Sequence, residues 1–200
     1  VQLRTDTALY SRDRLVTLDW TNTDLTQESQ REERRTESVQ FRMIEHIKAE
    51  ARHEILFDDD GKGEAADIVG ISLDTPTLPK LITVDLYHCK YSSAPEPGAR
   101  IGDMYEVCGQ AQRSVLWMHN KDRRTDLFAH LLKREALRIE SGRATRLEVG
   151  TRDRLIEIRD LSRTCRIAIR VFIVQPGLSK IQAADHQLAV LGVTEKFLQE

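Results

Sequence analysis

Apolar residues along the chain follow two different periods, and the change from one to the other predicts both strands and helices. Segments in which every second residue is apolar, or in which a short apolar run is unbroken, are typical of strands and cover residues 54–60, 65–73, 81–91 and 166–175. Segments with apolar residues three or four positions apart are typical of amphipathic helices and cover residues 24–52, 102–120, 125–140, 151–162 and 179–197. This order predicts an α/β fold in which helices flank a mixed sheet.

The first three predicted strands should form an antiparallel meander. The turn at residues 60–63 contains two glycines, which adopt the positive φ angles of tight hairpins, and a short loop at 75–79 joins the next pair of strands. Residues 1–24 show only partial alternation, and we interpret them as a strand-rich N-terminal segment, compatible with the end of a preceding domain. Residues 25–200 then form the main domain. A first residue Val1 rather than Met favours an excised module of a longer protein.

Composition excludes several classes of protein. The hydrophobic content of 40% and the charged content of 31% are those of a globular domain. No apolar run reaches the roughly 18 residues that are needed to cross a bilayer. Three widely spaced cysteines (Cys89, Cys108 and Cys165) argue against a disulfide framework and favour the reducing cytoplasm. The sequence has neither a C-x-x-C pair, as expected of structural zinc sites, nor a glycine-rich P-loop for nucleotide binding.

Charge is unevenly distributed along the chain, although the net charge is only −2. Residues 1–99 carry twelve Lys and Arg against nineteen Asp and Glu, whereas residues 100–170 carry sixteen against ten. An acidic half that binds metal beside a basic half that faces phosphates would produce this distribution. Two solvated faces of an ordinary protein would produce it equally well, so the charge pattern alone does not choose between them.

Polar side chains interrupt two otherwise apolar strand faces. By the period of two, Asp67 shares a face with the apolar residues at 69, 71 and 73, while His88 and Lys90 extend the face that includes Leu86. Burial of an unpaired carboxylate costs several kcal/mol, so Asp67 requires a partner. A carboxylate that holds a divalent cation, beside a lysine that stabilises phosphate charge, is the arrangement that metal-dependent phosphodiester cleavage needs.

The helices predicted on either side of these strands carry two further candidates. Glu37 lies at the edge of the apolar stripe of the helix at 24–52 and would supply another metal ligand, the alternative being an exposed ion pair. Gln110 lies among apolar residues of the helix at 102–120 and would position the lysine or the DNA. The alternative for Gln110 is a structural amide that ties this helix to the sheet.

Taken in order, these residues resemble the PD-(D/E)XK nuclease superfamily. Asp67 matches its metal-binding acid, Lys90 its lysine, and Gln110 the glutamine motif of the RecB-like branch. The segments GEAADIVGI, LYHCKYS and GARIGDMYEVCGQAQRS also resemble nuclease modules joined to helicases in bacterial anti-phage defence proteins. The resemblance covers residues 37–117. It implies a restriction-endonuclease-like mixed sheet, a Mg²⁺ or Mn²⁺ cofactor, and a helicase or translocase module in the same protein or complex.

One position departs from the pattern of that superfamily. The residue two positions before the lysine is normally Asp or Glu, and here it is His88. Either the imidazole binds the metal and shifts the preference away from Mg²⁺, or another acid (Glu37, Glu64 or Asp85) completes the site, or the site is inactive. Asp85 ranks last because its side chain should point to the opposite face of the sheet from Lys90.

The predicted function is cleavage of DNA with a divalent metal held by Asp67, Glu37 and His88. Basic residues that follow in the sequence, Arg113, Arg100 and Lys121, would contact DNA phosphates without reading bases. The alternative is a nuclease-like module that binds DNA or a protein partner but does not cut, and a third interpretation is an assembly scaffold without DNA affinity. No membrane association is expected, and assembly into an oligomer is compatible with the sequence.

Overall fold

The predicted sheet is present, with one additional short strand. The structure is a computed structural model and describes residues 9–74, 80–118 and 125–199. After a 3-10 turn, η1 (Arg12–Arg14), the elements in chain order are α1 (Val39–Glu50), β1 (Ile55–Asp58), β2 (Ile68–Asp74), β3 (Leu81–Cys89), α2 (Gly102–Arg113), α3 (Val115–Met118), α4 (Asp126–Glu140), β4 (Leu147–Val149), α5 (Arg152–Leu161), β5 (Arg166–Val174) and α6 (Asp185–Gln199).

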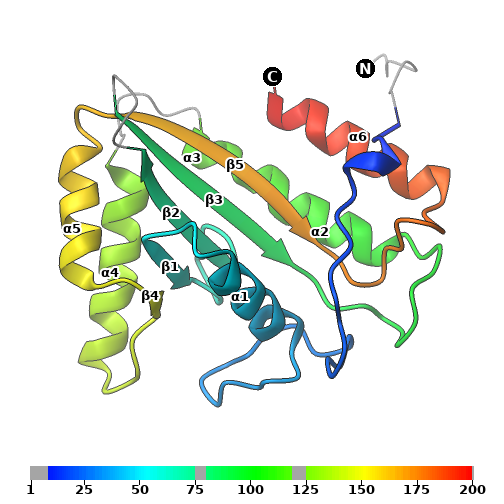
Figure 1. Ribbon diagram of the computed structural model, residues 1–200, viewed down its shortest axis with the longest axis horizontal. Helices are drawn as coiled ribbons and strands as arrows, with labels where there is room; N and C mark the ends of the chain where they lie inside the picture. The colour runs from blue at the N-terminus through cyan, green and yellow to red at the C-terminus, as the bar shows by residue number, and fades with distance from the viewer. Residues whose placement is uncertain (1–8, 75–79, 119–124, 200) are drawn as a thin grey trace.

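Five strands form one mixed sheet in the order β4-β1-β2-β3-β5 (Figure 1). β1, β2 and β3 are the predicted antiparallel meander; β4 pairs antiparallel with β1, and β5 pairs parallel with β3. The prediction of an α/β fold with helices flanking a mixed sheet is therefore confirmed. Register places Val69 opposite Leu86 and Ile71 opposite Val84, so the apolar faces predicted for β2 and β3 are one continuous surface.

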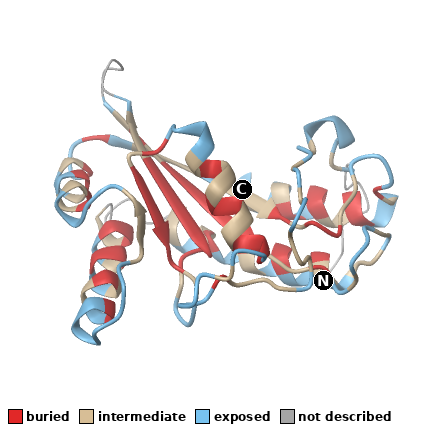
Figure 2. Ribbon diagram, turned by 60° about the horizontal axis from the view of Figure 1, so that its bottom comes forward, coloured by how far each residue is buried: buried red, intermediate tan, exposed pale blue. Residues whose placement is uncertain are grey.

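Helices cover both faces of this sheet (Figures 1 and 2). On one face Leu86 packs in a buried cluster with Phe128 of α4 and Leu155 of α5. On the other face Ile68 packs in a second cluster with Ile44 of α1. Each such buried side chain stabilises the fold by about 1.5–3 kcal/mol. Burial on both faces also explains why β2 and β3 are almost continuously apolar in sequence.

The first helix is much shorter than the sequence predicts. α1 begins at Val39 rather than near residue 24, because Ser38 is extended and its Oγ accepts a hydrogen bond from the Phe41 amide at 3.2 Å. Arg31 and Arg34 have positive φ angles of 51° and 55°, which an α-helix excludes. The polar residues before Ser38 therefore form a loop, although the sequence predicts a helix there.

Removal of this N-cap is expected to destabilise the protein. Ser38→Ala leaves an amide of the first turn of α1 without its acceptor, which costs about 1 kcal/mol. The urea midpoint should fall while the slope of the transition stays unchanged. Thr36→Ala, at an exposed position two residues earlier, is the matched control and should shift the free energy of unfolding by less than about 0.5 kcal/mol. Equal effects of the two substitutions would contradict the assigned start of α1.

The N-terminal segment contains no strand within residues 9–24, so the prediction of strands is wrong for this part, and residues 1–8 lie outside the described residues. Its apolar residues act as separate anchors instead. Leu18 and Trp20 pack against the cluster under α1, and Leu15 packs against the cluster between α2 and α6. The Tyr10 amide also donates to the Leu188 carbonyl at 3.0 Å. Anchors on different elements leave no neighbouring strand with which this segment could pair.

Three further boundaries differ from the prediction. The helix predicted at 102–120 is divided at Ser114 into α2 and α3, the last helix begins at Asp185 rather than 179, and the short strand β4 was not predicted. β4 has three residues, which is too short for its period to be recognised in a sequence. Among the described residues, no helix is long and apolar enough to span a membrane.

Candidate metal centre

The meander brings four charged residues to the same end of the sheet. Asp60 and Glu64 lie in the turn between β1 and β2, Asp67 directly precedes β2, and Lys90 directly follows β3. Oxygen atoms of Asp60, Glu64 and Asp67 lie within 4.8 Å of one another. Ligand oxygens around Mg²⁺ or Mn²⁺ are each about 2.0–2.3 Å from the ion, so a single cation can reach all three carboxylates with small side-chain movements.

Each of the three carboxylates is oriented by one hydrogen bond. The Cys89 amide donates to Oδ2 of Asp67 at 2.8 Å, and the Gly61 amide donates to Oε2 of Glu64 at 2.7 Å. The Ser29 hydroxyl donates to Oδ2 of Asp60 in a short contact. The second oxygen of each carboxylate has no donor among the residues that the structure describes, which leaves three hard anionic oxygens for a cation.

Burial and the charges of neighbouring acids disfavour the charged forms of Asp67 and Glu64. Asp67 is only 3% exposed, and burial raises its pKa well above the ordinary range; the charge of Glu64 raises it further, against the Cys89 hydrogen bond. Burial likewise raises the pKa of Glu64, and the charges of Asp60 and Asp59 add to this effect. Such a group is stabilised either by protonation or by a cation, and near neutral pH a divalent cation is the effective alternative.

Lys90, at the same end of the sheet, is held by two carboxylates. Its Nζ lies 3.0 Å from Oε2 of Glu28 and 2.8 Å from Oε2 of Glu106, and its side chain is 12% exposed. Burial alone would lower the pKa of the ammonium, but the hydrogen bonds to Glu106 and Glu28 outweigh it and raise the pKa. Lys90 is therefore a fixed positive charge rather than a proton acceptor. The charge of Glu28 also raises the pKa of Asp67.

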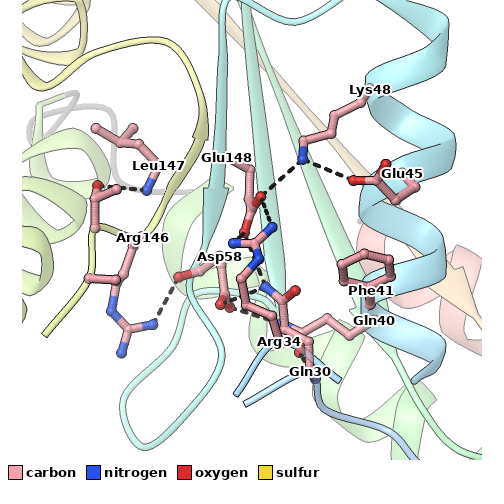
Figure 3. Close-up of polar contacts among 12 residues, drawn as sticks. Gln30, Arg34, Gln40, Phe41, Glu45, Lys48, Asp58, Arg146, Leu147 and Glu148 are labelled. Carbon is pink, nitrogen blue, oxygen red and sulfur yellow. Dashed lines mark hydrogen bonds and ion pairs between the residues drawn. The ribbon is translucent and has the colours of Figure 1, made fainter. Parts of the chain in front are cut away.

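A buried amide network fastens the loop that carries Glu28 (Figure 3). Gln40 of α1 donates from Nε2 to Oδ1 of Asp58 at 2.9 Å, and Gln30 donates from Nε2 to Oδ2 of the same residue at 3.0 Å. The backbone amide of Gln30 donates in turn to Oε1 of Gln40 at 2.9 Å. The loop, α1 and the end of β1 are thus tied together.

Ion pairs at Glu148 of β4 extend this network outward (Figure 3). Arg34 binds Glu148 with both terminal nitrogens, at 2.7 and 2.8 Å, and Lys48 of α1 lies 3.1 Å from the same carboxylate. Gln30 joins the two parts of the network by a hydrogen bond of 3.2 Å to Glu148. The short strand β4 therefore serves to fix the loop, and indirectly Glu28, above the sheet.

Two arginines hold the turn that carries Asp60 and Glu64. Arg134 of α4 donates to the carbonyl oxygens of Asp59 at 2.6 Å and Lys62 at 2.9 Å, and its guanidinium also pairs with the Asp59 carboxylate. Arg146 donates to the Asp60 carbonyl at 3.1 Å. Hydrogen bonds from two guanidinium groups fix the backbone of a turn that would otherwise be mobile.

Loosening of this turn is expected to weaken metal binding. Arg134→Met keeps the length of the side chain and removes its hydrogen bonds, so the affinity for Mn²⁺ measured by calorimetry should fall about tenfold, as for other residues that orient metal ligands. The matched control is Arg163→Met, at an exposed position after α5, which should leave the affinity unchanged. Unchanged affinity in the Arg134 variant would show that the turn is rigid without this contact.

α2 presents one face to the carboxylate group. Glu106, Gln110 and Arg113 are four and three residues apart, so they lie on the same side of the helix. Glu106 contacts Lys90, and the charge of Arg113 lowers the pKa of both Glu64 and His88. Gln110 lies between them, and its buried Oε1 accepts no hydrogen bond from the part of the chain that the structure describes. Gln110 and Arg113 therefore lie on the face of α2 that also carries Glu106, the partner of Lys90.

His88 is close in sequence to the site but is not part of the carboxylate group. It is buried, and its Nε2 lies 2.8 Å from the Ser114 hydroxyl at the end of α2. Burial lowers its pKa to about 4, helped by the charge of Arg113, so the ring is neutral at pH 7. The predicted role of His88 as a metal ligand is therefore replaced by a structural role that ties β3 to the α2–α3 junction.

Glu37 is the second predicted ligand that the structure places elsewhere. It is exposed and precedes α1 instead of lying within it, and among the described residues its side chain accepts a single hydrogen bond, of 3.5 Å, from the Thr36 hydroxyl. The prediction assumed a helix through residue 37, and that assumption is wrong. Glu28 of the same loop, and not Glu37, contacts Lys90.

Asp85 faces away from the site, as predicted. It is fully buried on the opposite face of the sheet, where Arg170 of β5 binds it through two hydrogen bonds of 2.6 Å. Of the acids proposed to complete the site, only Glu64 is thus in position. The Asp85–Arg170 pair instead joins β3 to β5.

The three predicted DNA contacts have different outcomes. Arg113 is exposed on the site-facing side of α2. Arg100 is partly buried and donates to the Glu96 carbonyl at 2.6 Å and to the Ser92 hydroxyl at 3.0 Å, so it holds its own loop and is not free for DNA. Lys121 lies outside the described residues.

Sequence reasoning missed three residues of the site: Asp60, Glu28 and Glu106. The acidic run 58–60 beside a glycine-containing turn was a usable signal for Asp60, since a turn next to Asp67 must bring its own side chains close. Glu106 also had a signal, because it lies one helical turn before Gln110. No sequence signal indicated Glu28, because its position depends on a loop that is fixed by contacts with β1 and β4.

Comparison of the chain with protein-family models, with curated proteins and with solved structures finds no match in any of the three. The site is therefore interpreted from its own geometry and chemistry.

Proposed function

We propose that this protein is a metal-dependent deoxyribonuclease that hydrolyses phosphodiester bonds with a divalent cation, Mg²⁺ or Mn²⁺. The observation that carries the proposal is the group of Asp60, Glu64 and Asp67, whose oxygens converge within 4.8 Å at the end of the sheet where Lys90 follows β3. Carboxylate oxygens are the ligands that these hard cations prefer, and an adjacent cationic side chain suits a reaction that develops negative charge on phosphate.

Each residue of the site has a distinct role under this proposal. Asp67, with Asp60 and Glu64, would hold the ion, which when bound activates water and polarises the phosphate. Lys90, kept protonated by Glu28 and Glu106, would stabilise charge on the scissile phosphate and orient the attacking water. The free acceptor Oε1 of Gln110 would accept a hydrogen bond from that water. Arg113, exposed on the same face of α2, would bind a neighbouring phosphate.

The surroundings of the site favour backbone contact with DNA rather than recognition of bases. Arg113 and the basic residues after position 143 are suited to phosphate contacts, which carry no sequence information. Aromatic residues make up only 6% of the chain, so stacking on unpaired bases has little support. Targeting would then come from elsewhere, and we propose a helicase or translocase module in the same protein or complex, acting in antiviral defence in the cytoplasm.

A second candidate function is a nuclease-like module that binds DNA without cutting it. The observation that favours it is His88, which takes a position normally held by an acid and points to Ser114 rather than to the carboxylates. Lys90 is also engaged by two carboxylates, so a phosphate would have to compete with Glu28 and Glu106 for it.

Cleavage of supercoiled and linear DNA by the purified chain, with Mg²⁺, Mn²⁺ or Ca²⁺, tests the two candidates. If the protein is a nuclease, we expect nicking or degradation of the DNA with Mg²⁺ or Mn²⁺ and no cleavage in the presence of a chelator. Binding of Mn²⁺ should also raise the free energy of unfolding, by about 2.7 kcal/mol at a hundred times the dissociation constant. The double variant Asp60→Asn, Glu64→Gln should lose both effects, whereas Glu140→Gln, at an exposed position on α4, should lose neither.

The same experiment separates the remaining interpretations. DNA retardation without cleavage in every metal would favour the binding module over the nuclease. Absence of cleavage, of metal-dependent stabilisation and of DNA binding at low salt would leave only a scaffold and would overturn the proposal.

A further inference from the structure

β5 is the last strand of the sheet, and its outer edge has no neighbouring strand. β3 pairs with it on the inner side along all nine residues. In a parallel pairing, alternate residues direct their N–H and C=O groups to the outer side. Within the described part of the chain, no further backbone hydrogen bond reaches residues 167–173. The edge is also apolar and only partly buried, which natural proteins avoid unless the edge has a partner.

A groove of about 740 Å³ runs along this edge. Its lining includes the consecutive residues 171–174 of β5 and the two residues after them. Because neighbours in a strand point to opposite faces of the sheet, a groove that touches consecutive residues reaches the edge, and it also extends over the face that carries Tyr87 and Phe172. The other walls are residues 14–18, Met43 of α1, and Leu191 and Leu198 of α6. Figure 1 shows α6 and the N-terminal segment beyond the free side of β5.

We infer that this groove binds an extended polypeptide segment, which pairs with β5 as an additional strand and places apolar side chains at every second position. The unpaired backbone groups of the edge require a partner with the same spacing of donors and acceptors, which an extended backbone provides.

Charged residues that line the groove indicate which charge the bound segment should carry. Arg14 is paired with Glu195 at 2.6 Å, and Arg52 is paired with Glu50 at 3.1 Å. Lys180 donates to the Asp13 carbonyl at 3.1 Å and has no carboxylate partner among the described residues. A segment with an acidic residue where it passes Lys180 would neutralise this charge. None of Asp60, Glu64 and Asp67 lines the groove, so the inference does not rest on the proposed nuclease activity.

Selection of a phage-displayed peptide library, with apolar residues at alternate positions, against the full chain tests the inference. Enriched peptides should carry Asp or Glu toward one end and should protect alternate amides of residues 167–173 from hydrogen exchange. N-methylation of the backbone amides that face β5 removes about three hydrogen bonds and should weaken binding on the order of a hundredfold. Lys180→Glu should weaken binding about three- to tenfold, whereas Lys133→Glu, at an exposed position on α4, should not change it.

Two results would overturn the inference. One is the absence of enrichment over a library without the alternating pattern. The other is equal affinity of the N-methylated peptides, which would make the groove a pocket for side chains or a small molecule instead of a strand site.

Discussion

Replacement of Asp67 by Asn is expected to abolish metal-dependent DNA cleavage, with a loss on the order of 10³-fold or more. Asp67 is the most buried of the three acids, and one of its carboxylate oxygens lies within 4.8 Å of oxygens of the other two. The amide keeps the shape of the side chain and still accepts the Cys89 hydrogen bond, but it contributes no charge to a cation. The affinity for Mn²⁺, measured by calorimetry, should fall in parallel with the cleavage rate.

The same substitution is expected to stabilise the protein when no metal is present. Burial raises the pKa of Asp67, so ionisation of this side chain opposes folding. Its carboxylic acid form favours folding below the ordinary carboxyl range, and this advantage is lost as pH rises through the raised pKa. Relative to the wild type, Asp67→Asn should therefore gain about 1–2 kcal/mol near pH 7 and less near pH 4.

Comparison of urea unfolding at the two pH values, with and without Mn²⁺, checks this expectation. Addition of Mn²⁺ should stabilise the wild type and leave the variant unaffected, which reverses their order. Glu140→Gln is the matched control for loss of an acidic charge, and it should behave as the wild type throughout. Loss of stability in Asp67→Asn at neutral pH would mean that the carboxylate is paired in the fold rather than held for a cation.

Replacement of Lys90 by Met is expected to reduce cleavage about 10²- to 10³-fold while metal binding is retained. The ammonium is not one of the cation's ligands, and its loss removes a positive charge beside three carboxylates. The affinity for Mn²⁺ should therefore stay the same or become slightly higher, in contrast to Asp67→Asn. Since Glu106 is 61% exposed and Glu28 27% exposed, their release from Lys90 should cost less than about 1 kcal/mol of stability.

Lys133→Met, on the exposed surface of α4, is the control for loss of a lysine elsewhere. It should change neither cleavage nor metal affinity. If Lys90→Met cleaves DNA at the wild-type rate, Lys90 serves only to pair Glu28 with Glu106, and the role assigned to its charge is wrong.

Periodic patterns in the sequence were sufficient to predict four of the five strands and most helices. β2, β3 and β5 are long and apolar on both faces, so their existence did not depend on any detail of their surroundings. The prediction of a helix at 24–52 was wrong for residues 24–38, where long-range contacts determine the backbone conformation. Positive φ angles at Arg31 and Arg34, and hydrogen bonds from Gln30 to β1 and β4, override local preference there.

The site was predictable where strand parity and adjacency decide it. Asp67 and Lys90 lie at the same end of adjacent antiparallel strands in any meander, and a glutamine on the following helix can reach them. Parity also excluded Asp85 correctly. The role of His88 could not be predicted in this way. Its side chain contacts Ser114, which lies at a break between two helices that the sequence predicts as one.

The sequence by itself determined the α/β class, the meander and the position of Asp67 and Lys90 at the same end of adjacent strands, because these follow from periods of two and 3.6 residues and from short connections. Only the tertiary structure decided which further acids complete the group. The hydrophobic pattern fixes where strands lie, whereas the turn held by Arg134 and the loop held by Asp58 depend on hydrogen bonds between residues far apart in the chain. Such contacts leave no periodic trace, and so Asp60 and Glu28 became visible only in the fold.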